Sequence, residues 1–490
     1  MSSDRQMARG GAWMVLMRWT MRGIGLLSTL ILARLLTPGD FGVIAMAMIV
    51  VGLLEILAQT GVDLALIREP EPSREDFDSA WTLQILISLT IGILLFLIAP
   101  FAADAFSEPK IRPVIQALAL RSAMSGFSNV GTIEFRRKLD FRMEFRYNIA
   151  KRLSNFMIIV IAAIVLRSYW ALVIGMIMAQ VVEVGFSYAF HPYRPRPCLR
   201  KVKQLFSFSA WLVFYRTARF LSRRVDQFVV GGFAGTTFMG NYYIAYDLAT
   251  SPTNELVVPM GRGLYPVYAR LREEPGKLVE AYLKALGTVA LLLVPLGFGL
   301  AAVAPDAVPV VLGAKWRAAI PLVEILAVFG VFFGLSNTIE AVLTVIGRVR
   351  LLAALSFSQI GTLALALYLV AKYVGVDAIA AVRCAVAILT LPFVFLVLRR
   401  VLPVGIGATV RVLWPPFAAG LAMVACVLAV QALDMPGPVR LVLEIAAGGL
   451  SYMAAVLAIW YLRACPDGAE KAVVAWCRAR LVRRAPAGPA

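Results

Sequence analysis

Apolar segments of about 20 residues recur along the whole chain, with short charged connections between them. A helix needs about 20 mainly apolar residues to cross roughly 30 Å of hydrocarbon, and its backbone groups must be satisfied within the helix. Composition agrees, because 60% of the residues are hydrophobic and 16% are charged, whereas a soluble domain is about 45–50% apolar and about 25% charged. The sequence therefore predicts an all-α integral membrane protein of about 14 transmembrane helices.

The predicted segments follow one another so closely that no stretch between them is polar enough to form a soluble domain. The first continues past Arg18 and Arg22 without a small-residue cleavage site, so we expect a retained helix and not a signal peptide. The segments lie at residues 13–33, 41–67, 81–103, 114–135, 153–166, 170–190, 205–233, 242–260, 282–303, 320–346, 351–373, 378–398, 412–433 and 441–462.

Basic residues gather in alternate connections between these segments. Lys and Arg in short loops near helix ends mark the cytoplasmic side, and the opposite loops, such as 231–240 and 374–377, are nearly neutral. Both termini are therefore expected in the cytoplasm. This asymmetry accounts for the formal net charge of +19 without nucleic acid as a partner, and the basic ends can attract anionic membrane lipids. The basic connections include Arg136, Arg137, Lys138, Arg142, Arg146, Lys151, Arg152, Arg194, Arg196, Arg200, Lys201 and Lys203.

Motifs of enzymes are largely missing from the sequence. The chain has one histidine, and it has no glycine-rich phosphate loop of the kind that binds ATP. The longest connection expected outside the cell is near 305–319 and leaves little room for an external active site. We therefore expect a protein that is not an enzyme, with no metal or cofactor, and keep a membrane glycan polymerase or ligase as the alternative outside transport.

An internal repeat appears when the chain is shifted by 198 positions. The shift aligns 11–18 with 209–216 at Ala, Trp, Val and Arg, and aligns Gly42 with Gly240. Two similar bundles can rock about a site near the bilayer midplane, as carriers do. We expect a six-helix bundle at 1–198, a second at 199–405, an added helix pair at 406–465 and a basic cytoplasmic tail at 466–490.

Several motifs resemble flippases of the polysaccharide transporter family. The first hairpin contains ARLLTPGDFGVIAM and QTGVDLALIR, and the repeat-equivalent hairpin contains RVDQFVVG and MGNYYIAYDL. Further matches are YPVYARL, VPLGFGL and LGAKW, so the resemblance covers most of residues 10–345. It implies the exporter superfamily that also holds multidrug antiporters and peptidoglycan-precursor flippases, and a fold of two pseudo-symmetric six-helix bundles, here with an added C-terminal helix pair.

The resemblance also implies a function and a location. We expect a flippase of the bacterial cytoplasmic (inner) membrane that moves polyprenyl-pyrophosphate-linked oligosaccharide, the repeat unit of lipopolysaccharide or exopolysaccharide, by alternating access. Polysaccharide-assembly proteins are expected neighbours. A peptidoglycan-precursor or multidrug exporter of the same superfamily is the alternative within transport.

Arginines on two repeat-equivalent helices are the candidate substrate-binding residues. Ionisable groups inside a membrane are costly and usually face a wet cavity or a partner. Arg18 and Arg22 share one helix face, and Arg216, Arg219 and Arg223 share another. A guanidinium matches phosphate geometry, so these stripes would bind a pyrophosphate headgroup. The alternative is that they anchor the helices at the cytoplasmic interface.

Acidic residues within predicted helices form a second candidate set. They could bind a coupling proton or sodium ion, or they could pair with the arginines; we favour pairing. These residues are Glu55, Asp63, Asp226, Asp247 and Glu340.

Overall fold

The structure is a computed structural model that describes residues 2–58, 66, 69, 71–138, 140–201 and 210–464. Every regular element in these ranges is a helix, as the apolar periodicity predicts. The chain forms two compact units, Met1–Gly240 and Asn241–Ala490. These units are defined by compactness and not by repeat symmetry. The predicted bundle boundary at residue 198 and the separate helix pair at 406–465 therefore stay predictions.

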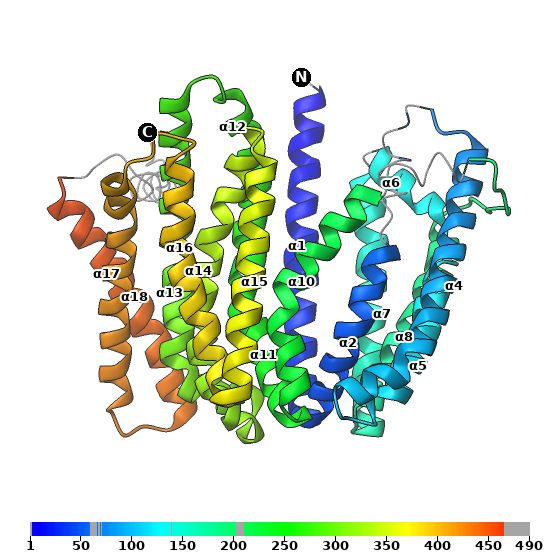
Figure 1. Ribbon diagram of the computed structural model, residues 1–490, viewed down its shortest axis with the longest axis horizontal. Coiled ribbons are helices and arrows are strands. Elements are labelled where there is room, and N and C mark those ends of the chain that lie inside the picture. Colours follow the sequence, from blue (N-terminus) through cyan, green and yellow to red (C-terminus); the bar gives the residue numbers. More distant parts are fainter. Residues whose placement is uncertain are drawn as a thin grey trace, which may run out of the picture. The chain divides into compact units, whose positions relative to one another are not determined.

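Four helices of the first unit pair as neighbours, α4 with α5 and α7 with α8, while α1 runs alongside α7. Their order along the chain can be followed in Figure 1. The helices are α1 (Ser2–Leu35), α2 (Pro38–Ala58), α4 (Arg74–Ala105), α5 (Ile111–Ser125), the 3-10 helix η1 (Val130–Thr132), α6 (Ile133–Arg137), α7 (Phe141–Leu166), α8 (Trp170–Phe190) and α10 (Ala210–Phe233).

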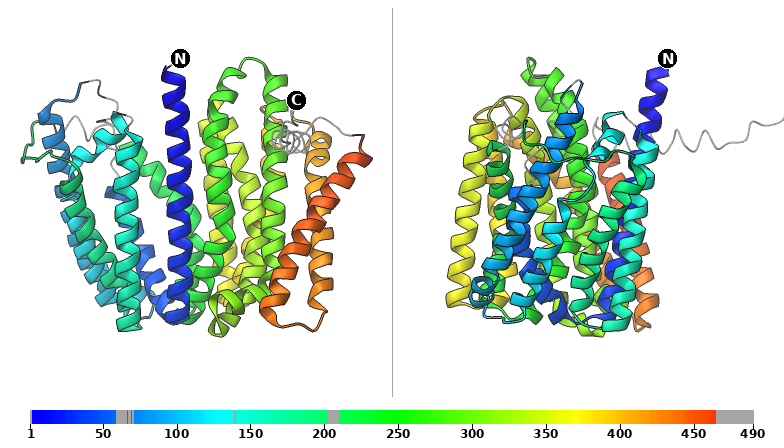
Figure 2. Two further views of the ribbon diagram at one scale, coloured as in Figure 1. Left: turned by 180° about the vertical axis from the view of Figure 1, so that it is seen from behind. Right: turned by 90° about the vertical axis from the view of Figure 1, so that its right-hand side faces the viewer.

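Helices of the second unit pack around α13 and α14, and α17 lies beside α18 (Figure 2). The preceding helix, α11 (Thr236–Pro252), begins in the first unit and continues into the second. The others are α12 (Val258–Arg270), α13 (Pro275–Ala307), α14 (Ile320–Val345), α15 (Val349–Tyr373), α16 (Ile379–Arg399), α17 (Ile406–Gln431) and α18 (Gly437–Leu462). The short elements are the π-helices η2 (Thr253–Val257) and η3 (Val308–Leu312) and the 3-10 helices η4 (Ala314–Ala319) and η5 (Val376–Ala378).

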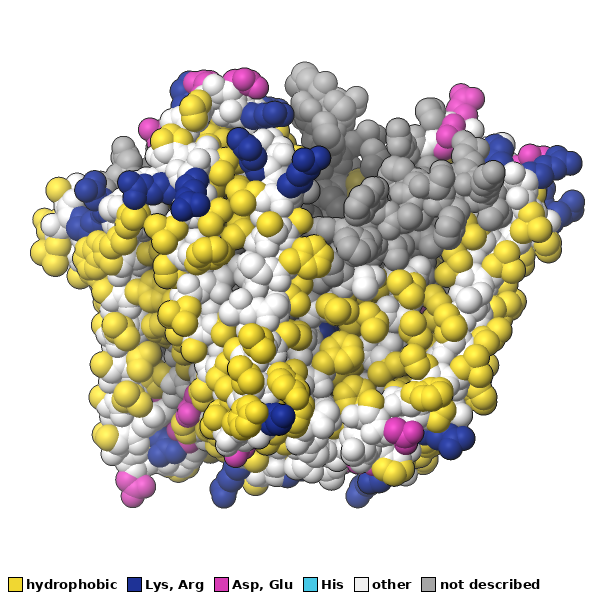
Figure 3. Space-filling model, viewed as in Figure 1, with side chains coloured by type: hydrophobic (Ala, Val, Ile, Leu, Met, Phe, Trp, Pro, Cys, Tyr) yellow, Lys and Arg dark blue, Asp and Glu magenta, His cyan; other side chains and the backbone are white. Residues whose placement is uncertain are grey.

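Among the described residues, ten helices are long and apolar enough to cross a membrane. Two of the other four predicted segments coincide with α1 and α10, which carry several arginines. The third coincides with the 15-residue α5, and the fourth runs from α11 through η2 into α12. The predicted number of fourteen spans therefore stays a prediction, while the multi-pass helical fold is confirmed. Large hydrophobic side chains are exposed on these helices, and Figure 3 shows them over the middle of the second unit with Lys and Arg nearer the helix ends.

Two predicted boundaries in the first unit are wrong. The segment 114–135 is not one helix, because α5 ends at Ser125 and η1 and α6 follow. A Cβ on Gly126, the residue after α5, would lie 1.9 Å from Oγ of Ser88, so glycine permits the close approach to α4 at this break. The connection counted as a loop before residue 153 is helical, since α7 begins at Phe141 behind Asp140, whose side chain accepts from the backbone N–H of Met143 at 3.0 Å.

The segment after α8, residues 191–201, connects α4 with η1 through hydrogen bonds. It runs along α4, where Asp78 accepts the Tyr193 hydroxyl at 2.6 Å and the Arg196 backbone N–H at 2.7 Å. Nδ2 of Asn129 donates to the Tyr193 carbonyl at 2.7 Å, which fixes η1 to the same segment. Buried polar groups that are satisfied in this way hold one geometry. The segment therefore positions η1 and α6 over the ends of α4, α7 and α8.

Candidate functional site

Arg22 is the predicted arginine whose surroundings are described most fully. It lies half-buried on α1, close enough to Arg152 on α7 for the two guanidinium groups to repel each other. A Cβ on Gly25 would lie 2.5 Å from Nη2 of Arg152, so the Arg152 side chain lies against the backbone of α1. Two cations brought together inside membrane helices form a candidate site for an anion.

Sequence reasoning missed Arg152 as a site residue. It was counted with Lys151 among the cytoplasmic loop charges, whereas it lies in the fourth turn of α7 and faces α1. Its Nε is buried and has no hydrogen-bond partner in the structure. The signal was present in the sequence, because the capping residue Asp140 before a run without Gly or Pro indicates an earlier helix start.

The other predicted arginines are placed by their backbone. Arg18 lies on α1, and Arg216, Arg219 and Arg223 lie on α10. Arg223 is half-buried. The side chains of the other three fall outside the part of the chain that the structure describes, so their role in binding stays a prediction.

Glu55 forms an ion pair within the first unit. Its Oε1 accepts from Nη1 of Arg121 at 2.9 Å and from the Ser122 hydroxyl at 2.8 Å. About a quarter of each charged side chain is exposed, 25% for Arg121 and 27% for Glu55. This geometry favours pairing over ion coupling for Glu55, and it brings α2 to α5.

The remaining acidic candidates that the structure describes lie on three different helices. Asp226 is fully buried on α10, while Asp247 on α11 and Glu340 on α14 are half-buried. Asp63 falls outside the described residues. No group of three His, Cys, Asp or Glu side chains that could hold a metal ion occurs within the described ranges. Ion coupling by these residues stays a prediction.

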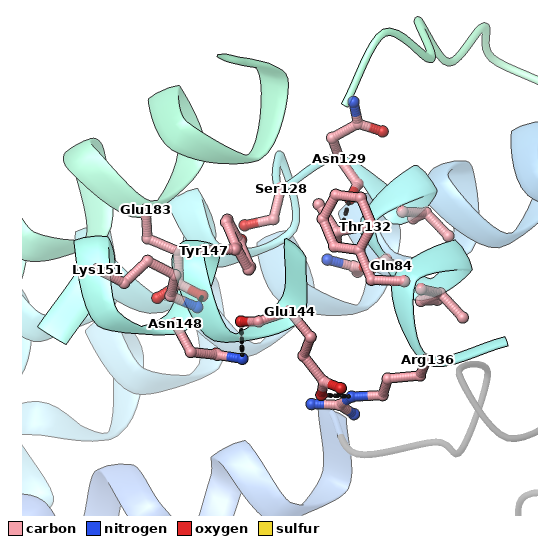
Figure 4. A pocket seen from close by; sticks show the side chains of 13 residues that line it. Gln84, Ser128, Asn129, Thr132, Arg136, Glu144, Tyr147, Asn148, Lys151 and Glu183 are labelled. Carbon is pink, nitrogen blue, oxygen red and sulfur yellow. Dashed lines mark hydrogen bonds and ion pairs between the residues drawn. The ribbon is translucent and has the colours of Figure 1, made fainter. Parts of the chain in front are cut away.

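A polar cavity of about 200 Å³ lies between α4, η1, α6, α7 and α8 (Figure 4). The sequence analysis did not find it, because its residues come from five elements and carry no motif. Its lining residues are Gln84, Ser128, Asn129, Val130, Thr132, Ile133, Phe135, Arg136, Glu144, Tyr147, Asn148, Lys151 and Glu183.

The charges of the cavity occur as two ion pairs. Nε of Arg136 on α6 donates to Oε1 of Glu144 on α7 at 2.8 Å, and Nζ of Lys151 on α7 pairs with Glu183 on α8. Nζ of Lys151 also lies 4.9 Å from the centre of the Tyr147 ring. Each pair joins two elements, so the cavity has fixed walls and no net charge from these four groups.

The amides of the cavity are held by neighbouring backbone. Nδ2 of Asn148 donates to the Glu144 carbonyl at 2.9 Å, and Nε2 of Gln84 donates to the Ser125 carbonyl at 3.2 Å. Oδ1 of Asn129 accepts the Gly131 backbone N–H at 2.9 Å. These bonds fix the orientation of three side chains that can still accept or donate further hydrogen bonds.

Comparison with known proteins gives a family and a fold. The family model described as "Polysaccharide biosynthesis protein" matches residues 31–321. The chain is 24% identical over 357 residues to the lipopolysaccharide biosynthesis protein WzxC of Escherichia coli (strain K12), covering 71% of this chain and 72% of that protein. It is 25% identical over 326 residues to the succinoglycan biosynthesis transport protein ExoT of Rhizobium meliloti (strain 1021), covering 66% of each.

A solved structure gives the fold of the whole chain. The lipid II flippase MurJ, in an inward closed conformation, superposes with a TM-score of 0.66 and 12% sequence identity. The match covers 91% of this chain and 98% of that one. At this identity the likeness shows the fold alone, a multi-pass helical fold, as predicted.

Proposed function

The chain belongs to the polysaccharide biosynthesis protein family, whose model it matches over residues 31–321, and we propose that it is a flippase for polyprenyl-pyrophosphate-linked oligosaccharide. This match, over more than half of the 490 residues, is the observation that carries the proposal. The names of the Escherichia coli and Rhizobium meliloti relatives assign them to lipopolysaccharide and succinoglycan biosynthesis, and the second name includes transport. The cargo would be a repeat unit of such a polysaccharide.

The headgroup of that cargo suits the cations on α1 and α7. A pyrophosphate carries several negative oxygens, and guanidinium groups bind such oxygens through charge-assisted hydrogen bonds. Arg22 and Arg152 repel each other in the unliganded protein, so an anion between them would remove a repulsion as well as form new bonds. Arg18, Arg216, Arg219 and Arg223 are proposed to extend this cationic surface.

The transport step is proposed to be alternating access without covalent chemistry. Exporter folds built from repeats expose a central site to each side of the membrane in turn, and the lipid tail would stay in the bilayer. We place the protein in the bacterial cytoplasmic (inner) membrane with both termini in the cytoplasm, because its basic connections alternate with nearly neutral ones. Membrane lipids and polysaccharide-assembly proteins are its proposed partners there.

The test is movement of a fluorescent polyprenyl-pyrophosphate oligosaccharide across the bilayer of proteoliposomes. We expect the parent to move it, and Arg22→Gln, Arg152→Gln and Arg223→Gln to move it more slowly while inserting normally. Arg146→Gln, an exposed arginine on α7, is the matched control and should transport like the parent. A parent that moves no lipid with or without an ion gradient would exclude the flippase function.

A further inference from the structure

The polar cavity between α4, η1, α6, α7 and α8 has no role in the proposed binding of pyrophosphate at Arg22 and Arg152. We propose that it holds one neutral, hexose-type sugar residue of the lipid-linked glycan, the residue attached to the pyrophosphate, while the pyrophosphate lies at Arg22 and Arg152. This inference rests on the proposed function. It adds a sugar subsite inside the first unit, at the end of the bundle where the sequence predicts the cytoplasm.

The charged groups of the cavity form ion pairs, which favours a neutral ligand. Arg136 is paired with Glu144, and Lys151 with Glu183. A free phosphate or a metal ion needs uncompensated charge, which these four groups do not offer. A neutral sugar needs hydrogen bonds, and a carboxylate that has accepted one bond from its cation can still accept others from hydroxyl groups.

Hydrogen-bonding groups line the cavity on several sides. The amides of Gln84 and Asn148 and the hydroxyl of Ser128 face the same space (Figure 4). Its volume of about 200 Å³ corresponds to roughly six or seven water molecules at about 30 Å³ each. A sugar ring with several hydroxyl groups would replace such a water cluster and reuse its hydrogen bonds.

One wall of the cavity is aromatic. The rings of Phe135 and Tyr147 lie 6.2 Å apart, centre to centre, in an edge-on arrangement, and both line the space. An aromatic ring offers an apolar face, and tyrosine adds a hydroxyl group. A pyranose has an apolar C–H face and polar edges, so the aromatic carbons and the Tyr147 hydroxyl of this wall can contact both.

The cavity adjoins the proposed phosphate site along α7. Lys151 points towards Glu183 on α8, and the next residue, Arg152, lies against Gly25 on α1. Consecutive helical residues differ by about 1.5 Å in height and about 100° in direction. The two sites therefore lie at nearly one level on adjacent faces of the same helix, and one lipid-linked ligand is proposed to contact both.

The test is calorimetric binding to the full chain in lipid nanodiscs. The two probes are a short-chain isoprenyl pyrophosphate carrying one glucose and the same pyrophosphate without sugar. Asn148→Leu keeps the side-chain shape and removes the amide. We expect it to raise the Kd of the glucosylated probe about tenfold, the effect of leaving a polar partner unsatisfied, and to leave the Kd of the bare probe unchanged. Tyr147→Phe is a second variant that removes one oxygen and retains the ring.

The control variant is Glu75→Gln, which breaks an exposed pair with Arg200 on the same end of the unit but outside the cavity. It should bind both probes like the parent. The inference is overturned if the parent binds the two probes equally, or if both cavity variants bind the glucosylated probe like the parent. Loss of transport in proteoliposomes with retained preference for the glucosylated probe would refute the flippase function and leave the sugar subsite standing.

Discussion

Gly42 and Gly240 make reciprocal backbone contacts at the starts of α2 and α11. A Cβ on Gly42 would lie 1.7 Å from the carbonyl oxygen of Thr236, and a Cβ on Gly240 would lie 1.7 Å from that of Pro38. Gly42 and Gly240 are 198 positions apart, and so are Pro38 and Thr236. The contact is therefore symmetric in the register of the sequence repeat, and it uses small residues to bring helix backbones together as membrane helices do.

Replacement of Gly42 by alanine should destabilise the protein. The new methyl group cannot lie 1.7 Å from a carbonyl oxygen, so the two helix starts must separate, at about 1–3 kcal/mol or more for overpacking. We expect a lower midpoint of thermal unfolding in detergent. The control is Gly39→Ala on the same helix, where the nearest atom to a Cβ is 3.6 Å away. An unfolding midpoint for Gly42→Ala equal to that of Gly39→Ala would refute the close contact.

The helical segments and the repeat register could be predicted from the sequence because both depend on local composition. Long apolar runs must become helices in a membrane, and the shift that aligns Gly42 with Gly240 agrees with their reciprocal contact. The break after Ser125 could not be predicted in the same way. Averaged hydropathy continues through it, whereas Gly126, directly after the end of α5, packs against α4, a contact between segments distant in sequence that composition does not reveal.

The candidate site was only partly predictable for the same reason. Arg22 stands out in the sequence as a charge inside an apolar run. Its neighbour Arg152 is identified only once α7 is packed against α1. The pairing of Lys151 with Glu183 likewise depends on the contact of α7 with α8. A single sequence shows which residues are ionisable but does not show which of them meet.

Glu55 and Arg121 should behave as a pair in a double-mutant cycle. The 2.9 Å contact predicts that Glu55→Gln and Arg121→Met each lower the unfolding midpoint, and that their coupling energy is about 1 kcal/mol, within the usual range of about 0.5–3 kcal/mol for contacting residues. Unfolding of the two single variants and the double variant measures this. Pairing also predicts that Glu55→Gln keeps any ion dependence of transport; loss of that dependence would support ion coupling instead.

Arg440 of α18 binds both carboxylate oxygens of Asp306 at the end of α13. The contacts are 2.8 Å from Nε and 2.5 Å from Nη2, and the fully buried carboxylate of Glu444 lies 3.8 Å from Nε. Asp306 is buried and Glu444 is fully buried, so Arg440→Met would leave two buried carboxylates without their cation, and we expect it to destabilise the protein. The midpoint of thermal unfolding is the measurement.

The control for Arg440 is Lys277→Met. Lys277 forms an ion pair with Glu274 in which 65% and 53% of the side chains are exposed, and such surface pairs contribute about 0–1 kcal/mol. We expect this variant to unfold near the parent midpoint. Equal midpoints for the two variants would show that the Asp306 contact does not hold α18 to α13.

Arg152 should contribute to anion binding without contributing to stability. Its guanidinium is half-buried, its Nε has no hydrogen-bond partner, and the positive charge of Arg22 lies nearby, so Arg152→Met removes a poorly solvated charge and a repulsion and should leave the unfolding midpoint unchanged or higher. The same change removes charge-assisted bonds to the ligand, each about 1.5–3 kcal/mol. We therefore expect the Kd of the bare isoprenyl pyrophosphate to rise at least about tenfold.

The opposite signs of these two effects separate binding from packing. A residue that served only to hold α1 against α7 would lower the unfolding midpoint when replaced, and ligand affinity would fall only through loss of folded protein. Arg146→Met, at an exposed position on the same helix, controls for the loss of one positive charge from α7. If Arg146→Met weakens pyrophosphate binding as much as Arg152→Met does, the effect is a general one of net charge, and no anion site exists at Arg22 and Arg152.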